Sequence, residues 1–338
     1  MLFRSALPPE VLTAHGKRAA VDVHGGMMST SGGNATFTVL TLNTLIGNIN
    51  AKGGIATTAG SFHGGPALAG PRYDLASFPG AIEAKGFPAI RCRAPYQKST
   101  EFKQKVASGQ NPYPSEHPWY PLTPPNMPGE HLLSHANGSP FKYKCWINWT
   151  GNVVYGHGGL RQAVDRRLRD PADLPLIVGI DTFHNETNAY ADYLVPDPCM
   201  YEVWGGFSSA WAGVLTRMST ARWPAVAPRQ EKSAAGEPVC MELFVIEVAK
   251  RMGLPGFGEG AIPGADGTLH PLNTPEDYYL RLAANVAWFG GDVLPSPSER
   301  DIALSGIGRI LPDIARVLPP EERGPVAYAY SRGGRFAP

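Results

Sequence analysis

The feature that most constrains the fold of this sequence is a short apolar stretch that ends in an acidic residue. Residues 176–180 read Leu-Ile-Val-Gly-Ile, and Asp181 and Thr182 follow them directly. A continuous apolar run of this length predicts a strand that is buried on both faces. A second strand is predicted over residues 193–195, before Pro196. Because ligands of open α/β sheets bind beyond the carboxyl ends of the strands, we expect a binding crevice beside Asp181.

A glycine-rich loop is predicted near the start of the sequence. Residues 19–23 predict a strand, and the loop that follows runs to Gly33 and contains His24, Gly25, Gly26 and Met28. Asn34 is the expected N-cap of the next helix. Its expected apolar side consists of Phe37, Leu40, Leu42, Leu45, Ile46 and Ile49. A strand, a glycine loop and a helix N-terminus together favour anion binding, although a tight turn without a ligand fits the same pattern.

A third strand, over residues 142–149, leads to a turn at Gly151 and Asn152. A helix over residues 159–169 follows, and we expect its arginines to face solvent. Further along, a helix over 240–252 is expected to turn Met241, Phe244, Val245, Val248 and Met252 inward. A glycine-rich loop then leads to a helix over 275–287 that is capped by Thr274.

These elements predict an α/β fold with a mainly parallel twisted sheet and flanking helices, similar to nucleotide-binding domains. The α/β domain is expected over residues 1–60 and 141–290. A Pro- and aromatic-rich insertion is expected over 61–140, with one short helix over 101–107, and a linker over 291–338 towards a further domain. The insertion is expected to line a substrate funnel, to contact a partner subunit or simply to cover the surface.

The composition excludes several classes of function. With 43% hydrophobic residues, 17% charged residues and a net charge of +1, the chain has ample material for a core. It has no charge excess that would favour binding to a polyanion. We find no apolar run long enough to span a membrane and no secretory signal at the start.

The sequence offers little support for a metal site or for a nicotinamide site. The four cysteines, Cys92, Cys145, Cys199 and Cys240, are too far apart in sequence for a zinc or iron–sulfur motif, so free or buried thiols or a disulfide are expected. No histidine pair has helical zinc-site spacing. No GxGxxG follows a predicted strand, which disfavours a nicotinamide-dependent dehydrogenase.

The order of motifs around Asp181 resembles the molybdopterin oxidoreductases of the dimethyl sulfoxide reductase type. The matching positions are Asp181, Glu186-Thr187, Ala191-Asp192, Leu194-Val195-Pro196 and Glu202, with the 42–48 helix motif and Gly53-Gly54 upstream. Two positions depart from the family pattern. Val203 stands where a basic residue often follows the glutamate, and Val153 stands where proline often follows Asn152.

The resemblance implies that the chain binds molybdopterin guanine dinucleotide with molybdenum. The positions assigned to this cofactor are His24, Gly25, Gly26, Met28, Gly151, Asn152, Asp181, Thr182, Thr187 and Glu202. Asp181 is expected to accept hydrogen bonds from a guanine edge or a ribose diol, with a loop-capping role as the alternative. Glu186 and Asp192 are expected to be structural, and a structural role is equally open for His24.

Family features outside the matched region imply that the chain is inactive alone and belongs to a longer protein. The 4Fe-4S cluster motif and the molybdenum ligand are expected upstream, and a pterin-binding barrel downstream. The family resemblance implies two partners, an iron–sulfur electron-transfer subunit together with a membrane quinol-oxidising subunit. It also implies a periplasmic location.

Two segments narrow the expected substrate. Residues 276–282 and 330–336, with the pattern around Asn188, resemble tetrathionate reductase catalytic subunits, which implies two-electron reduction of tetrathionate to thiosulfate in the intact enzyme. Reduction of arsenate, polysulfide or another sulfur oxyanion is the alternative within the family. A nucleotide-binding module without redox chemistry is the alternative outside it.

Overall fold

The computed structural model describes residues 32–45, 47, 62, 71–80, 96–116, 128–138, 142–208, 217–234 and 236–336. The predicted strand 19–23 and the loop with His24, Gly25, Gly26 and Met28 lie outside these residues. The chain divides into two compact units. The first contains the described residues of 1–78, 204–225 and 259–338, and the second contains those of 79–203 and 226–258.

The second unit is built on a parallel sheet of three strands in the order β1-β2-β3. The strands are β1 (Cys145–Trp149), β2 (Leu176–Asp181) and β3 (Tyr193–Pro196). The helical elements of this unit are η1 (Tyr96–Lys98), α3 (Thr100–Ala107), α4 (Pro128–Asn137), α5 (Val153–Gly156), α6 (Leu160–Leu168), η2 (Asn188–Tyr190) and α7 (Met241–Arg251). The central strand β2 is buried from Ile177 to Ile180, as its apolar run predicts.

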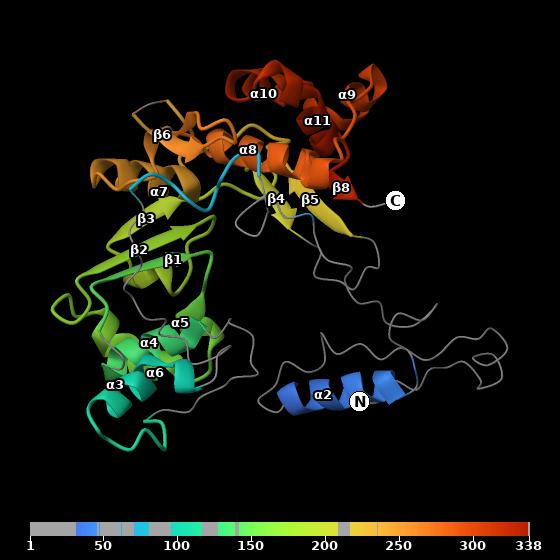
Figure 1. Cartoon of the computed structure of the whole chain (residues 1–338). Coiled ribbons are helices and arrows are strands. Elements are labelled where there is room, and N and C mark those ends of the chain that lie inside the picture. Colours follow the sequence, from blue (N-terminus) through green and yellow to red (C-terminus); the bar gives the residue numbers. More distant parts are fainter. Residues whose placement is uncertain are drawn as a thin grey trace, which may run out of the picture. The chain divides into compact units, whose positions relative to one another are not determined.

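Helices cover the parallel sheet on two sides. Apolar side chains of α4, α5 and α6 form one core with Leu174 and Ile177, and α7 packs against β3. In Figure 1 the sheet lies between α7 and the α4–α6 group. The mixed α/β class with a parallel sheet is therefore confirmed.

The first unit has a different architecture. Its strands form an antiparallel sheet, β4 (Gly205–Ser208), β5 (Met218–Arg222) and β8 (Gly334–Phe336), and a two-stranded sheet, β6 (Gly258–Pro263) with β7 (Leu269–Leu272). The other elements are α2 (Gly32–Leu45), α8 (Pro275–Ala287), η3 (Phe289–Gly291), α9 (Glu299–Ser305), η4 (Ile307–Ile310), α10 (Leu311–Val317) and α11 (Pro320–Ser331). A mainly parallel sheet therefore describes the second unit only.

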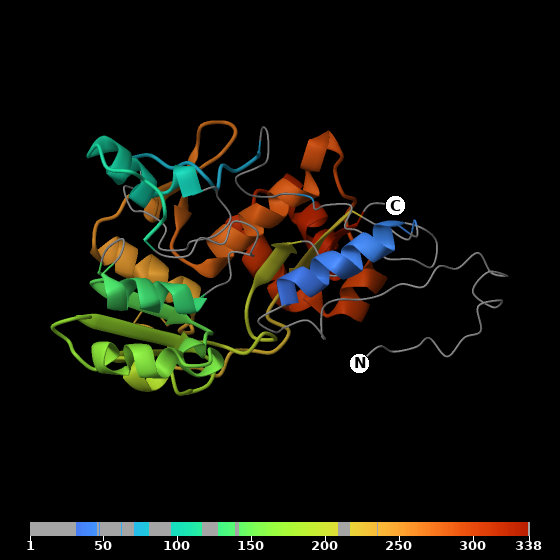
Figure 2. The same cartoon turned by 90° about the horizontal axis from the view of Figure 1, so that it is seen from below.

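The core of the first unit surrounds α8. Leu280, Ala283, Ala284 and Val286 are completely buried, and α8 packs on α10 and α11. Figure 2 shows these helices from a second direction. Residues 299–336, which we expected to belong to a linker, thus form three α-helices and a strand of the folded unit. Their short helices, interrupted by Gly306 and Pro319, lack the long periodicity that would have revealed them.

Two helices differ in detail from the prediction. α2 begins at Gly32, so Asn34 lies inside the helix and is not its N-cap. Leu40, Leu42 and Leu45 of α2 are 40%, 46% and 79% exposed. At 100° per residue these leucines are spread around the helix and form no single apolar stripe.

The predicted inward face of α7 is wrong. The helix buries Leu243, Ile246 and Ala249, whereas Val245, Val248 and Met252 are exposed. Apolar residues occur around most of this helix, so its sequence did not define the packed face. The Met241 N–H donates to Asp197, which fixes the start of the helix.

Two regions expected to lack regular structure contain it. The insertion includes α4 as well as the predicted helix α3, and the glycine-rich loop before Thr274 contains the β6–β7 pair. Within the described part of the chain, no helix has the length and apolar character that a membrane span requires.

The cysteines that the structure describes are unpaired thiols. Cys145 and Cys199 are exposed, and Cys240 is buried at the N-cap of α7. Burial raises the pKa of the Cys240 thiol to about 12.

Candidate functional site at the carboxyl edge of the parallel sheet

The carboxyl ends of β1, β2 and β3 bring several of the predicted site residues together. Asp181 is the last residue of β2, and its neighbour on β3 is Pro196. On the other side, the N–H of Thr150 donates to the Ile180 carbonyl over 2.9 Å, which continues the pairing beyond β1. The turns after all three strands therefore start at one edge of the sheet, as parallel pairing requires.

The carboxylate of Asp181 is engaged by its own loop. Its Oδ1 accepts a 3.3 Å hydrogen bond from the Phe183 N–H. Its Oδ2 accepts from the side-chain amides of Asn185, over 2.9 Å, and Asn188, over 3.4 Å. Asp181 thus has the loop-capping contacts that we considered as the alternative, while its side chain stays partly exposed.

Asn185 joins this carboxylate to the following turn. While its Nδ2 donates to Asp181, its Oδ1 accepts from the backbone N–H groups of Thr187 and Asn188, at 3.0 and 2.9 Å. Asparagine favours such turns because its short amide reaches backbone groups two and three residues on. One amide therefore fixes both the carboxylate and the entry to η2.

The turn after β1 is tied directly to the turn after β2. Oδ1 of Asn152 accepts from the Thr187 N–H, over 3.2 Å, and from the Thr187 hydroxyl, over 2.9 Å. Nδ2 of Asn152 donates to Glu186 over 2.6 Å, and this hydrogen bond lowers the pKa of the exposed Glu186 carboxyl. The predicted residues Asn152 and Thr187 are thus in contact, although 35 positions separate them.

A buried amide pair lies beneath these turns. Asn148 of β1 donates to the Gly151 carbonyl over 2.6 Å and to Oδ1 of Asn188 over 3.3 Å. A Cβ at Gly179 would lie 2.7 Å from Oδ1 of Asn188, so only glycine allows this close approach. At Gly151 a Cβ would lie 2.9 Å from Asn148.

Two predicted positions bind backbone of the chain itself. The Thr182 hydroxyl donates to the Pro198 carbonyl over 3.3 Å, and Glu202 accepts from the Cys199 N–H over 2.9 Å. Asp192 accepts from the Ile177 N–H over 2.7 Å and so pins β3 to the start of β2, the structural role expected for it.

Several residues of this edge were not identified from the sequence. They are Asn148, Asn185, Asn188 and Asp197, of which Asp197 accepts from the Trp149 indole and from the Met241 N–H, both over 2.9 Å. Asn148 carried a signal, because it is a polar residue inside an otherwise apolar strand. Phe183 and Tyr155, in the turns after β2 and β1, expose 74% and 71% of their surface.

The arrangement is suited to recognition and offers no set of catalytic groups. It combines one carboxylate, several amides, a hydroxyl and exposed aromatic rings, which is the donor and acceptor set of a polar heterocycle site. Within the described ranges, no group of three or more His, Cys, Asp or Glu side chains is placed to hold a metal ion.

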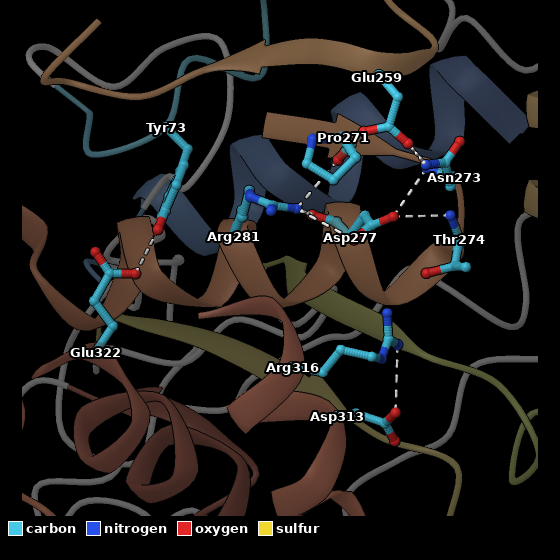
Figure 3. A network of polar contacts seen from close by, with 10 residues as sticks. All are labelled: Tyr73, Glu259, Pro271, Asn273, Thr274, Asp277, Arg281, Asp313, Arg316 and Glu322. Carbon is cyan, nitrogen blue, oxygen red and sulfur yellow. Dashed lines mark hydrogen bonds and ion pairs between the residues drawn. The ribbon is translucent and has the colours of Figure 1, made fainter. Parts of the chain in front are cut away.

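A second polar network lies in the first unit and is enclosed (Figure 3). The Tyr73 hydroxyl donates to the buried Glu322 over 2.8 Å, and Arg72 pairs with the same carboxylate. Burial raises the pKa of Tyr73 well above its usual value. Arg281 donates to the Asp277 carbonyl over 2.7 Å. These groups hold the 71–80 segment and α8 in place, and we assign them a structural role.

Comparison with known proteins identifies the class to which this chain is related. No protein-family model matches the sequence. The similar sequences are reductase catalytic subunits, which confirms the resemblance to the molybdopterin oxidoreductases.

The particular relative is a tetrathionate reductase subunit of Salmonella typhimurium. The two sequences are 46% identical over 329 residues, which cover 97% of this chain and 32% of that protein. A selenate reductase subunit of Mesobacillus selenatarsenatis is 30% identical over 341 residues, covering 96% of this chain and 31% of that protein. A tetrathionate reductase subunit of Archaeoglobus fulgidus is 31% identical over 329 residues, covering 93% and 29%. The chain thus spans about a third of the length of these relatives.

Among solved structures, acetylene hydratase from Pelobacter acetylenicus matches 38% of this chain and 16% of its own chain. The TM-score is 0.29 and the sequence identity 25%.

Proposed function

We propose that this chain is the part of a molybdenum-dependent oxidoreductase that holds one guanine nucleotide of a molybdopterin guanine dinucleotide cofactor. The observation that carries the proposal is Asp181, a partly exposed carboxylate at the carboxyl end of the central parallel strand. Nucleotides bind at this position in open α/β sheets. The turns at Gly151-Asn152 and Thr187, joined by hydrogen bonds, would form the neighbouring wall.

The donor set at this edge fits the nucleotide end of such a cofactor. Oδ1 of Asp181 has a single 3.3 Å partner, so it retains acceptor capacity for an N–H or O–H group. The residues of this chain would bind and orient the nucleotide, and the bound molybdenum centre would supply the two-electron chemistry. His24, Gly25, Gly26 and Met28 remain the proposed contacts from the N-terminal part.

For the whole protein we propose reduction of tetrathionate. Cleavage of its central sulfur–sulfur bond takes up two electrons and releases two thiosulfate ions. The identity of 46% to a tetrathionate reductase subunit supports this substrate. Selenate is the second candidate, because a selenate reductase subunit is 30% identical.

Electrons for this reaction have to come from elsewhere in the assembly. We propose two partners, an iron–sulfur electron-transfer subunit together with a membrane quinol-oxidising subunit, as well as a 4Fe-4S cluster in the longer protein. The relatives are themselves named as subunits, which supports a complex of several chains. A periplasmic location is part of the same proposal.

The test is the cofactor content of an Asp181 variant of the longer enzyme. Asp181→Ala should lower the pterin and molybdenum content of the purified protein several-fold, because the nucleotide loses its carboxylate partner. The matched control is Asp313→Ala, an exposed aspartate of α10 that pairs with Arg316. Normal pterin content in Asp181→Ala would refute the assigned role. Reduction assays with tetrathionate, selenate and arsenate on the unmodified enzyme decide the substrate.

A further inference from the structure

The hydrogen bonds already made by Asp181 limit what a nucleotide can use. A carboxylate has about four acceptor positions, two on each oxygen. At Oδ2, both are taken by amide groups of the chain, from Asn185 and Asn188. At Oδ1, one is taken by the Phe183 N–H. Only Oδ1 therefore has an acceptor position to offer.

Recognition of a guanine edge requires both oxygens of a carboxylate. The base presents N1–H and the exocyclic N2–H₂ side by side, and the two donors pair with the two oxygens as a bidentate contact. In the structure Nδ2 of Asn185, at 2.9 Å from Oδ2, occupies the position that one of these donors needs. The side chain of Asn185 is thus an internal substitute for part of the guanine base.

Of the two amides, Asn185 is the one that can be exchanged. Asn188 is buried, makes the longer contact of 3.4 Å, and is fixed from behind by Asn148 and by the close approach to Gly179. Asn185 is only partly buried. The Thr187 N–H, one of the two groups held by Oδ1 of Asn185, has a second acceptor in Asn152, so the turn keeps a hydrogen bond if Asn185 withdraws.

We propose that Asn185 competes with the base for Asp181 and thereby determines base specificity at this site. With Asn185 in place, Asp181 reads one donor of the base, and guanine binds no better than hypoxanthine, which lacks the exocyclic amine. With Asn185 withdrawn, both oxygens are free and the exocyclic amine is read. This inference rests on the proposed nucleotide-binding function.

The experiment measures the binding of GDP and IDP to the 338-residue chain by isothermal titration calorimetry. The informative variant is Asn185→Ser, because a serine hydroxyl still accepts from a backbone N–H of the turn but is too short to reach Asp181. Asn137→Ser, at the exposed end of α4, is the matched control. Asp181→Ala reports whether binding uses the carboxylate at all. Thermal unfolding of each variant shows that it is folded.

In the unmodified chain, the ratio of the IDP and GDP dissociation constants should be below about threefold, since only one donor is read. Asn185→Ser should raise this ratio by about fivefold or more, the effect of one additional hydrogen bond, mainly through tighter GDP binding. Asn137→Ser should leave the ratio unchanged.

Two other results have distinct meanings. If GDP binding depends on Asp181 but the ratio is unchanged in Asn185→Ser, the competition is refuted and the proposed function stands. A ratio above about tenfold in the unmodified chain refutes it as well, independently of any variant. If no variant binds GDP, or Asp181→Ala binds it normally, the nucleotide-binding proposal fails and this inference fails with it.

Discussion

Amide side chains make most of the side-chain hydrogen bonds that shape the edge around Asp181. Asn148, Asn152, Asn185 and Asn188 connect the turns after β1 and β2 to each other and to the strands beneath. An amide suits this task because it offers donors and acceptors without a charge that would have to be desolvated. The same principle operates in the first unit at Asn285.

Asn285 of α8 holds a segment that is distant in sequence. Its Oδ1 accepts from the Tyr73 N–H over 2.9 Å and its Nδ2 donates to the Tyr73 carbonyl over 2.7 Å, and all these groups are buried. Asn285→Ala should lower the free energy of unfolding by about 2–4 kcal/mol, because two buried backbone groups lose their partner. Urea unfolding measures this change. Asn137→Ala, at a surface position, should change it by less than about 0.5 kcal/mol. A similar small effect at Asn285 would contradict the assignment.

The residue types at the site could be predicted from the sequence better than their contacts. Asp181, Thr187 and Asn152 stand directly after strands or in polar turns, and such positions are recognisable from the pattern. That Asp181 binds Asn185 and Asn188 depends on loop geometry, which depends in turn on Gly179 and on the Asn148 side chain from another strand. No local pattern encodes such a contact.

At the scale of elements, apolar runs and breaker residues were reliable where they were clear. The strands β1, β2 and β3, and the helices α6, α7 and α8, lie within a few residues of their predicted positions. The faces of α2 and α7 were not predictable, because their apolar residues surround the helix and packing partners decide which ones are buried. The short strands β6 and β7 contain Gly and Pro, which propensity alone assigns to a loop.

The start of α8 shows how an element is fixed by a residue other than its expected cap. Thr274 occupies the N-cap position, but within the described structure its hydroxyl has no hydrogen-bond partner. Oδ2 of Asp277 instead accepts from the N–H groups of Asn273 and Thr274, at 2.9 and 3.0 Å. The buried Arg281 lies within 3.5 Å of the same carboxylate.

Variants of the two residues should therefore differ in stability. Asp277→Ala should lower the free energy of unfolding by about 3–5 kcal/mol, since it removes one partner of a buried ion pair. Thr274→Ala should lower it by less than about 1 kcal/mol. Thermal or urea unfolding of both variants gives the comparison, and a larger loss for Thr274→Ala would mean that the hydroxyl is the working cap.

At the scale of the whole molecule, two buried histidines link stability to pH. His135 in α4 is 1% exposed, and burial lowers the pKa of its imidazole. Burial also lowers the pKa of His270 in the first unit. The unfolded chain binds these protons more readily than the folded chain. The corresponding stability is present above about pH 6.5 and is lost as the pH falls towards the lowered pKa values.

The unfolding free energy of the chain should accordingly fall between pH 7 and pH 5. The slope contributed by each histidine is at most about 1.4 kcal/mol per pH unit. Replacing His270 by Gln should reduce the slope, whereas His184→Gln, at an exposed position, should leave it unchanged. Urea unfolding at several pH values measures the slopes. Equal slopes for the His270 variant and the unmodified chain would contradict this prediction.

The connection that carries Asp181, Asn185 and Thr187 is also the crossover between two parallel strands. It leaves β2 at one edge and returns to the opposite edge to begin β3, where Asp192 bonds to Ile177. A segment tethered to one sheet at both ends is a bridge and cannot swing aside as a flap does. Admission of a base at this edge must then rely on rotamer changes, and its timescale would be that of side-chain rotation, far faster than that of loop opening.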